Sequence, residues 1–322
     1  MPISKCEERF ELLTEEEQPK GLSAMQVHSR SIPTWHGEQV HGAGEVSAGA
    51  ADERLKQAHQ LQNTFTAVLA QFGREGFASA EPLPVDIPTE TAITSSWNEW
   101  FDQFGGTAYR SASEPGSGGS ADVDSVQTLK QDYGQILVDA YNAGGYLAPT
   151  KFLQSLDREQ LEAIQTIHRL AHPIDVYQLE DEGATNLLIP PAAQVDFDGD
   201  GLTQVGIGRT IRFPDSSTPT KIRDAWESAT AGLSMQQRAM YELQMKLPIM
   251  TANIQPDGSG GVRSVEPGDA AWVNPMASPS YSFEQAITDR LDYLDAFKNQ
   301  IPVEQWARDR DFWISFRDLL AA

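Results

Sequence analysis

The chain has 322 residues, of which 24 are basic and 46 acidic, and its formal net charge at pH 7 is −22. Such a polyanion is repelled by phosphate backbones and anionic lipid, which argues against binding to nucleic acids and membrane surfaces and favours cations and basic protein surfaces as partners. Hydrophobic residues make up 40% of the chain, enough for a substantial core. The single cysteine, Cys6, excludes an intrachain disulfide and a zinc–cysteine cluster.

Residues 1–50 mix acidic residues with Ser, Gly, Pro and Gln and lack a sustained apolar period, which predicts a disordered acidic leader. A basic region followed by an apolar run is missing, so a signal peptide of the usual kind is not expected. No stretch approaches the roughly 20 apolar residues that a membrane helix needs. We therefore expect no membrane insertion, and a protein that is cytoplasmic or exported without such a signal.

Residues 51–110 predict two amphipathic helices. In the first, apolar residues recur at threes and fours between Asp52 and Phe72. The second carries an aromatic stripe formed by Trp97, Trp100, Phe101 and Phe104. Two uses of this stripe are open, namely packing on the preceding helix and docking in the groove of a partner. Residues 111–120 have the composition of a flexible Ser/Gly linker, and we expect the main domain boundary there.

Residues 121–322 predict a helical domain. A polar residue followed three positions later by glutamine signals the start of three of its helices, at Asp157 and Gln160, Ser234 and Gln237, and Ser282 and Gln285. Pro248 is expected to stop the second of these helices, and residues 251–280 are expected to be a loop. In the last helix Trp306, Trp313 and Leu320 are spaced by seven, so they either seal the domain or join two chains. The predicted fold class is mainly α, with a short extended segment and an Asp-rich loop.

A pair of histidines in this domain raises the question of a metal site. His168 and His172 lie four residues apart, so both imidazoles can face one side of a helix. The zinc-hydrolase pattern HExxH needs a glutamate after the first histidine, where this chain has Arg169. We therefore interpret His168 as a half-buried packing residue and His172 as favourable to a helix C-terminus. With Asp175, the two histidines remain the candidate ligands of an alternative function, a metal-dependent hydrolase.

The most specific motif is the sequence VDFDGDG at residues 195–201, in which three aspartates at alternate positions are closed by Gly201. Carboxylates at positions 1, 3 and 5 with glycine at position 6 are the first half of a calcium loop. Positions 7 and 9 would add backbone or side-chain oxygens. The predicted calcium ligands are therefore Asp196, Asp198, Asp200, Leu202 and Gln204. The competing interpretation is a plain turn, because Asp and Gly also cluster where the chain reverses.

This loop resembles EF-hand and dockerin-type calcium loops over about half of its ligands. Position 12, a glutamate in an EF-hand and an aspartate in a dockerin-type loop, is Ile207 here. Pro190 and Pro191 exclude a helix that enters the loop directly, and residues 203–213 alternate like a strand. The resemblance thus implies an isolated loop with a dissociation constant of ~10⁻⁴ to 10⁻³ M. A carboxylate from elsewhere could complete it, for example Asp181, Glu182 or Asp215, although the acidic run at 180–182 is explained by a solvated turn.

The first functional hypothesis is a non-enzymatic protein-interaction or structural protein in which this loop binds calcium weakly and rigidifies the junction between helical halves. Motifs for acyl transfer, phosphoryl transfer and dinucleotide binding are missing from the sequence. The alternatives are the hydrolase described above and an exported bacterial protein in which the loop is only a turn. The order of the segments YGQILVDAYNAGGY, EDEGATNLLIPP and VDFDGDGL resembles bacterial proteins of unknown function, which implies a bacterial origin.

Overall fold

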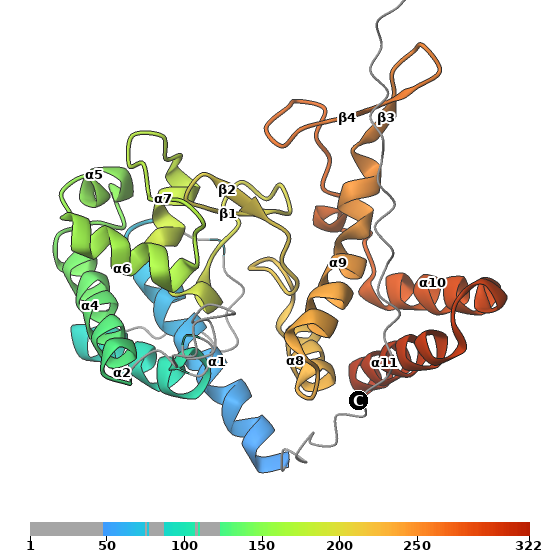
Figure 1. Ribbon diagram of the computed structural model, residues 1–322, viewed down its shortest axis with the longest axis horizontal. Helices are drawn as coiled ribbons and strands as arrows, with labels where there is room; N and C mark the ends of the chain where they lie inside the picture. Colours follow the sequence, from blue (N-terminus) through green and yellow to red (C-terminus); the bar gives the residue numbers. More distant parts are fainter. Residues whose placement is uncertain (1–47, 75, 77–86, 107–108, 110–122) are drawn as a thin grey trace, which may run out of the picture. The chain divides into compact units, whose positions relative to one another are not determined.

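The computed structural model describes residues 48–322 except 75, 77–86, 107–108 and 110–122 (Figure 1). The predicted mainly helical fold is confirmed. The disordered leader predicted for residues 1–50 falls almost entirely outside the described residues, as does the predicted linker at 111–120. The described residues belong to one compact unit, Gly44–Ala322.

The first hydrophobic core is built by the helices that precede the Asp loop. These are α1 (Ala48–Gln71), α2 (Glu90–Trp100), the π-helical turn η1 (Phe101–Gly105), α4 (Val123–Asn142), α5 (Pro149–Leu153), α6 (Arg158–His168) and α7 (Asp181–Leu187). Residues from both sides of the predicted boundary at 111–120 contribute to this core. The predicted boundary therefore separates segments of sequence that share one core.

The aromatic stripe spans α2 and η1, and two of its four members are buried. Trp97 and Phe101 are fully buried in the first core, and Trp97 Nε1 donates a hydrogen bond to the Lys130 carbonyl of α4 at 2.9 Å. Gly134 permits this approach, because a Cβ at that position would lie 2.9 Å from the Trp97 ring. The contacts of α2 with the preceding helix α1 agree with the packing interpretation of the stripe, and Trp97 also ties α2 to α4.

A second core is built by the helices that follow the Asp loop, α8 (Thr220–Thr230), α9 (Met235–Ala252), α10 (Phe283–Ala296) and α11 (Val303–Ala321). Short 3₁₀ turns complete the helical elements, η2 (Pro191–Ala193), η3 (Pro275–Ala277) and η4 (Lys298–Gln300). The helices α10 and α11 lie side by side (Figure 1). Trp313 and Leu320 are buried between these helices and α8, so this part of the tryptophan repeat seals the core.

Two small antiparallel hairpins accompany the helices. Strands β1 (Thr203–Val205) and β2 (Gly208–Thr210) form the first, and β3 (Ile254–Pro256) and β4 (Val262–Ser264) form the second. The strand or extended ribbon predicted for 203–213 is present as the β1–β2 hairpin, in which the chain reverses at Gly206, whose φ of 63° suits glycine. The loop predicted for 251–280 is corrected, since it contains the β3–β4 hairpin.

Pro248 does not stop α9, contrary to the prediction. The helix continues to Ala252 with Pro248 inside it. Met245 and Ile249 on either side of the proline are buried, so the packing of this helical face offsets the loss of one backbone hydrogen bond.

Candidate metal centre

The Asp loop is held at both ends by one buried side chain of α7. The Asn186 amide nitrogen donates to the carbonyls of Val195 (2.7 Å) and Gln204 (2.8 Å), and its amide oxygen accepts the Val195 N–H at 2.8 Å. Acidic residues in the first turn of α7 stabilise the positive end of the helix dipole. The proline after Ile189 prevents α7 from extending further along the chain. Asn186 therefore places the start of the loop beside its end.

Inside the loop, the chain folds around the carboxylate of Asp196. One of its oxygens accepts the N–H of Gly199 and the other accepts the N–H of Gly201, both at 2.8 Å. The two glycines have φ values of 70° and 89°, in the left-handed region that side chains disfavour. Asp198 and Asp200 each accept the N–H two residues further on, at 2.9 and 2.7 Å. All three aspartates thus help to shape the loop.

A fourth carboxylate, Glu182 of α7, points into the same loop. Its oxygens accept the N–H groups of Gln204 at 2.7 Å and of Phe197 at 3.0 Å. One ligand oxygen from each of Glu182, Asp196 and Asp198 lies within 4.8 Å of the others. The interpretation of this acidic run as a solvated turn is therefore wrong for Glu182, which is 9% exposed.

Ile207 stands where an EF-hand loop has its last carboxylate. Ile207, at position 12 of the loop numbering, lies in the turn between β1 and β2 and is 63% exposed. The isoleucine side chain offers no oxygen ligand. Glu182 comes from α7, which contacts β1, and its carboxylate reaches the backbone of the loop.

The convergence of these carboxylates is electrostatically costly. Burial, opposed by the Gly201 hydrogen bond and reinforced by the neighbouring carboxylates, raises the pKa of Asp196 to about 7. Burial also raises the pKa of Glu182, against hydrogen bonds from backbone N–H groups, and it raises the pKa of Asp200. Within the described residues, none of Glu182, Asp196 and Asp198 forms an ion pair with a basic side chain. A hard divalent cation would relieve this repulsion.

The predicted ligands divide into two groups. Asp196 and Asp198 belong to the cluster with Glu182, whereas Asp200 lies beside it and is bonded to the N–H of Leu202. The carbonyl of Gln204 accepts the Asn186 amide, so this oxygen already has a partner. From the sequence alone, Glu182 was only one of several carboxylates that could complete the calcium loop.

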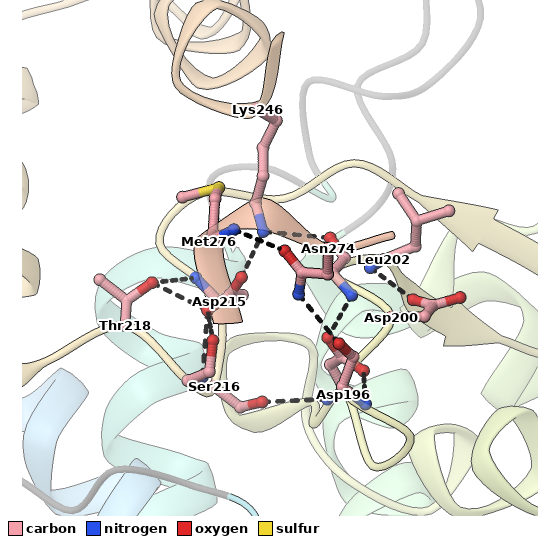
Figure 2. A network of polar contacts seen from close by, with 12 residues as sticks. Asp196, Asp200, Leu202, Asp215, Ser216, Thr218, Lys246, Asn274 and Met276 are labelled. Atoms are coloured by element: carbon pink, nitrogen blue, oxygen red, sulfur yellow. Dashed lines mark hydrogen bonds and ion pairs between the residues drawn. The ribbon is translucent and has the colours of Figure 1, made fainter. Parts of the chain in front are cut away.

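The outer side of the loop is bound by residues that follow it in the chain. Side chains of Lys246, Trp272 and Asn274 donate to three successive loop carbonyls, those of Gly201 (3.0 Å), Asp200 (2.9 Å) and Gly199 (2.9 Å). Figure 2 shows Lys246 reaching the loop from α9, with Asn274 beside it. The loop is thus a junction between the first core, through α7, and the elements of the second.

A buried ion pair reinforces this junction. The Lys246 ammonium group contacts the Asp215 carboxylate, and their side chains are 1% and 4% exposed (Figure 2). Ser216, the residue after Asp215, accepts the N–H of Asp196 at 3.0 Å. Burial alone would raise the pKa of Asp215, but the charge and hydrogen bond of Lys246, with the hydroxyls of Ser217 and Thr218, lower it. Asp215 therefore forms an ion pair with Lys246 and lies outside the acidic cluster.

The histidine pair does not form a metal site. Both ring nitrogens of His168 are occupied, since Nδ1 accepts the Gln194 amide at 2.9 Å and Nε2 lies 3.1 Å from the Leu187 carbonyl. Asp175 accepts the N–H of Tyr177 and the amide of Gln178. Among the described residues, the one group of three or more His, Cys, Asp or Glu side chains with converging ligand atoms is the cluster at Glu182. The histidine-based hydrolase site is therefore not assembled.

The environment of His168 predicts acid sensitivity. Burial lowers its pKa to about 3, from an ordinary value near 6.5. Between these values the unfolded chain binds a proton that the folded chain does not, so stability falls as the pH is lowered from 6.5 toward 3. We expect His168→Gln to remove about 1–3 kcal/mol of this pH-dependent loss. Urea unfolding of the wild type and His168→Gln at pH 7 and pH 4.5 measures this loss. An equal fall in the free energy of unfolding of the two proteins would contradict the prediction.

Comparisons with protein-family models, curated proteins and solved structures give no significant match. None of the helices that the structure describes is long and apolar enough to cross a membrane.

Proposed function

We propose that the loop Asp196–Gln204, completed by Glu182, binds calcium and that the protein acts by non-enzymatic recognition of a protein partner. The observation that carries the proposal is the convergence of Glu182 with Asp196 and Asp198 within 4.8 Å. Calcium takes six to eight oxygen ligands in flexible geometry, and carboxylates with backbone carbonyls are its usual protein ligands. Glu182 supplies the carboxylate that the local sequence lacks at position 12.

The site has a structural consequence if it binds calcium. The same loop offers carbonyls to Lys246, Trp272 and Asn274. At its two ends, the backbone N–H groups of Val195 and Gln204 donate to side-chain oxygens of Asn186 and Glu182 of α7. A cation that neutralises the carboxylates removes repulsion from this junction and stabilises both sets of contacts. Calcium would thus rigidify the connection between the two helical cores, on which a partner-binding surface depends.

Calcium is expected to stabilise the folded protein in proportion to its occupancy. At about ten times the dissociation constant, a ligand that binds only the folded state adds about 1.4 kcal/mol to the free energy of unfolding. Chelator-treated protein should therefore unfold at higher temperature as calcium is added at millimolar concentration. Thermal unfolding followed by circular dichroism measures this response.

A matched pair of variants separates calcium binding from turn formation. Asp198 and Asp257 are both exposed and both accept the N–H two residues further on, but only Asp198 belongs to the cluster. Asp198→Ala should abolish the calcium response, and Asp257→Ala should retain it. Equal responses in the wild type and Asp198→Ala would reject the site, and no response in the wild type would leave the loop as a turn.

A further inference from the structure

A cavity of about 570 Å³ lies between η1, the end of α6 and the segment that follows β2. The residues that line it include Phe104, Gly105, His168, Arg169 and Arg212. Small-molecule sites in proteins occupy about 300–1,000 Å³, so the volume suits a small organic ligand. The three carboxylates of the candidate calcium site do not line this cavity.

Arg212 brings a cation to the cavity without a carboxylate to pair with it. One of its N–H groups donates to the Pro191 carbonyl, and the guanidinium forms no ion pair with an acidic side chain of the described residues. Burial lowers the pKa of Arg212, although the charge of Glu242 opposes this change. Glu242 itself is bonded to Arg238 at 3.0 Å. A guanidinium presents five N–H donors in a planar fork, so an anion in the cavity would use donors that Pro191 does not take.

A second arginine of this cavity has a backbone conformation that its side chain disfavours. The φ of Arg169 is 53°, and in the described part of the chain it is the only residue other than glycine with a positive φ. Glycine is the usual residue in this conformation at the end of a helix. Strain of this kind is concentrated at functional sites, where the surrounding structure maintains it. An arginine here adds a cation to the cavity that glycine would not supply.

Aromatic rings form part of the cavity wall. Trp100 and Phe104 both line it, with ring centres 6.2 Å apart and planes inclined by 26°. Phe104 belongs to η1, and π-helical turns are rare and frequent at functional sites. The Arg169 guanidinium carbon lies 5.1 Å from the centre of the Tyr109 ring. Burial raises the pKa of Tyr109 to about 12, so at pH 7 this phenol is neutral and leaves the charge of Arg169 in place.

We propose that this cavity, the Arg212 cavity, binds a small aromatic acid. Its ring lies against Trp100 and Phe104, and its anionic group, a carboxylate or a phosphate, pairs with Arg212 and Arg169. The local charge favours an anion although the whole chain has a net charge of −22, because two arginines and one glutamate are the charged residues that line the cavity. Binding here does not require calcium, so this proposal and the calcium site can fail separately.

Calorimetric titration of the full chain tests the chemical class of the ligand. Three probes share one ring system, namely naphthoate, naphthyl phosphate and the uncharged naphthalenemethanol. The wild type is expected to bind at least one of the two anions saturably, and the alcohol about tenfold or more weakly. Whether naphthoate or naphthyl phosphate binds more tightly identifies the anionic group. No saturable heat from either anion at several millimolar, or equal affinity for the alcohol, would overturn the proposal.

Arginine variants locate the bound anion. Arg212→Met is expected to weaken binding of the preferred anion about tenfold or more, because charge-assisted hydrogen bonds are lost. Arg209→Met is the matched control, since Arg209 lies outside the cavity and pairs with Glu180. It should bind like the wild type.

Arg169→Gly keeps the test valid if Arg212→Met fails to fold. Glycine adopts the backbone conformation of residue 169 without strain, so this variant should unfold thermally no earlier than the wild type. It should nevertheless bind the preferred anion about threefold or more weakly, since one cation of the cavity is gone. Wild-type affinity in Arg169→Gly, or in a folded Arg212→Met, would overturn the proposal.

Discussion

Replacing Lys246 with methionine is expected to lower the free energy of unfolding by about 3–5 kcal/mol. The substitution leaves the Asp215 carboxylate buried without its cation and leaves the Gly201 carbonyl without its donor. Removing one partner of a buried ion pair costs more than removing both, because an uncompensated charge stays in a poorly solvated site. Urea unfolding at pH 7 measures the loss.

Two controls identify the buried charge as the cause. Lys221→Met removes an exposed lysine of α8 and should change stability by at most about 0.5 kcal/mol. Adding Asp215→Asn to Lys246→Met should recover part of the loss. Without Lys246 the pKa of Asp215 rises, so the folded Lys246→Met variant takes up a proton as the pH falls. The difference in free energy of unfolding between Lys246→Met and the wild type should therefore narrow from pH 7 toward pH 4. A loss that is unchanged in the double variant would contradict this explanation.

Gly183→Ala is expected to destabilise the protein by about 3 kcal/mol or more and to abolish the calcium response. A Cβ at Gly183 would lie 1.9 Å from the Gly206 carbonyl oxygen, in the turn of the β1–β2 hairpin. Both groups belong to the backbone, so α7 must move away from the hairpin. That movement breaks the hydrogen bond from the Gly206 N–H to the Gly183 carbonyl and displaces the adjacent Glu182.

Gly232→Ala is the control for this substitution. No atom lies within 4 Å of a Cβ placed at Gly232, so a change of at most about 0.5 kcal/mol is expected. Thermal unfolding of both variants, with and without calcium, gives the stability and the calcium response in one experiment. A Gly183→Ala variant as stable as Gly232→Ala would mean that α7 is not held against the hairpin as described.

Local signals in the sequence predicted the helices well. The capping boxes at Asp157 and at Ser234 are both present, each with its glutamine returning a hydrogen bond to the first residue. Ser282 likewise accepts the N–H of Gln285 at the start of α10. Each of these motifs acts over three residues, so distant parts of the chain do not alter it.

The errors arose where distant packing decides the local structure. Pro248 is tolerated inside α9 because Met245 is buried in the second core and Ile249 is buried beside Gly201 of the Asp loop. The β3–β4 hairpin was missed because its strands are three residues long and its exposed positions show no alternation. Neither outcome can be derived from propensities within the segment alone.

Two of the three carboxylates in the candidate site could be predicted as ligands from the sequence. The spacing of Asp196 and Asp198 identified the loop, but Glu182 lies 14 residues before it in the sequence and resembles its acidic neighbours. Its role follows from the contact between Gly183 and Gly206, which brings the start of α7 against the hairpin. A glycine in the first turn of an acidic helix was the available signal, because it permits such a close approach.

The most direct test of whether Glu182 completes the site is a calorimetric calcium titration. It compares three chelator-treated proteins, namely the wild type, Glu182→Gln and Glu180→Gln. Saturable binding by the wild type is expected, weakened about tenfold or more in Glu182→Gln and unchanged in Glu180→Gln, whose carboxylate instead pairs with Arg209. Far-UV circular dichroism must first show that both variants keep the helical content of the wild type. Equal affinities for Glu182→Gln and the wild type, or no heat from the wild type up to several millimolar calcium, would contradict the proposed site.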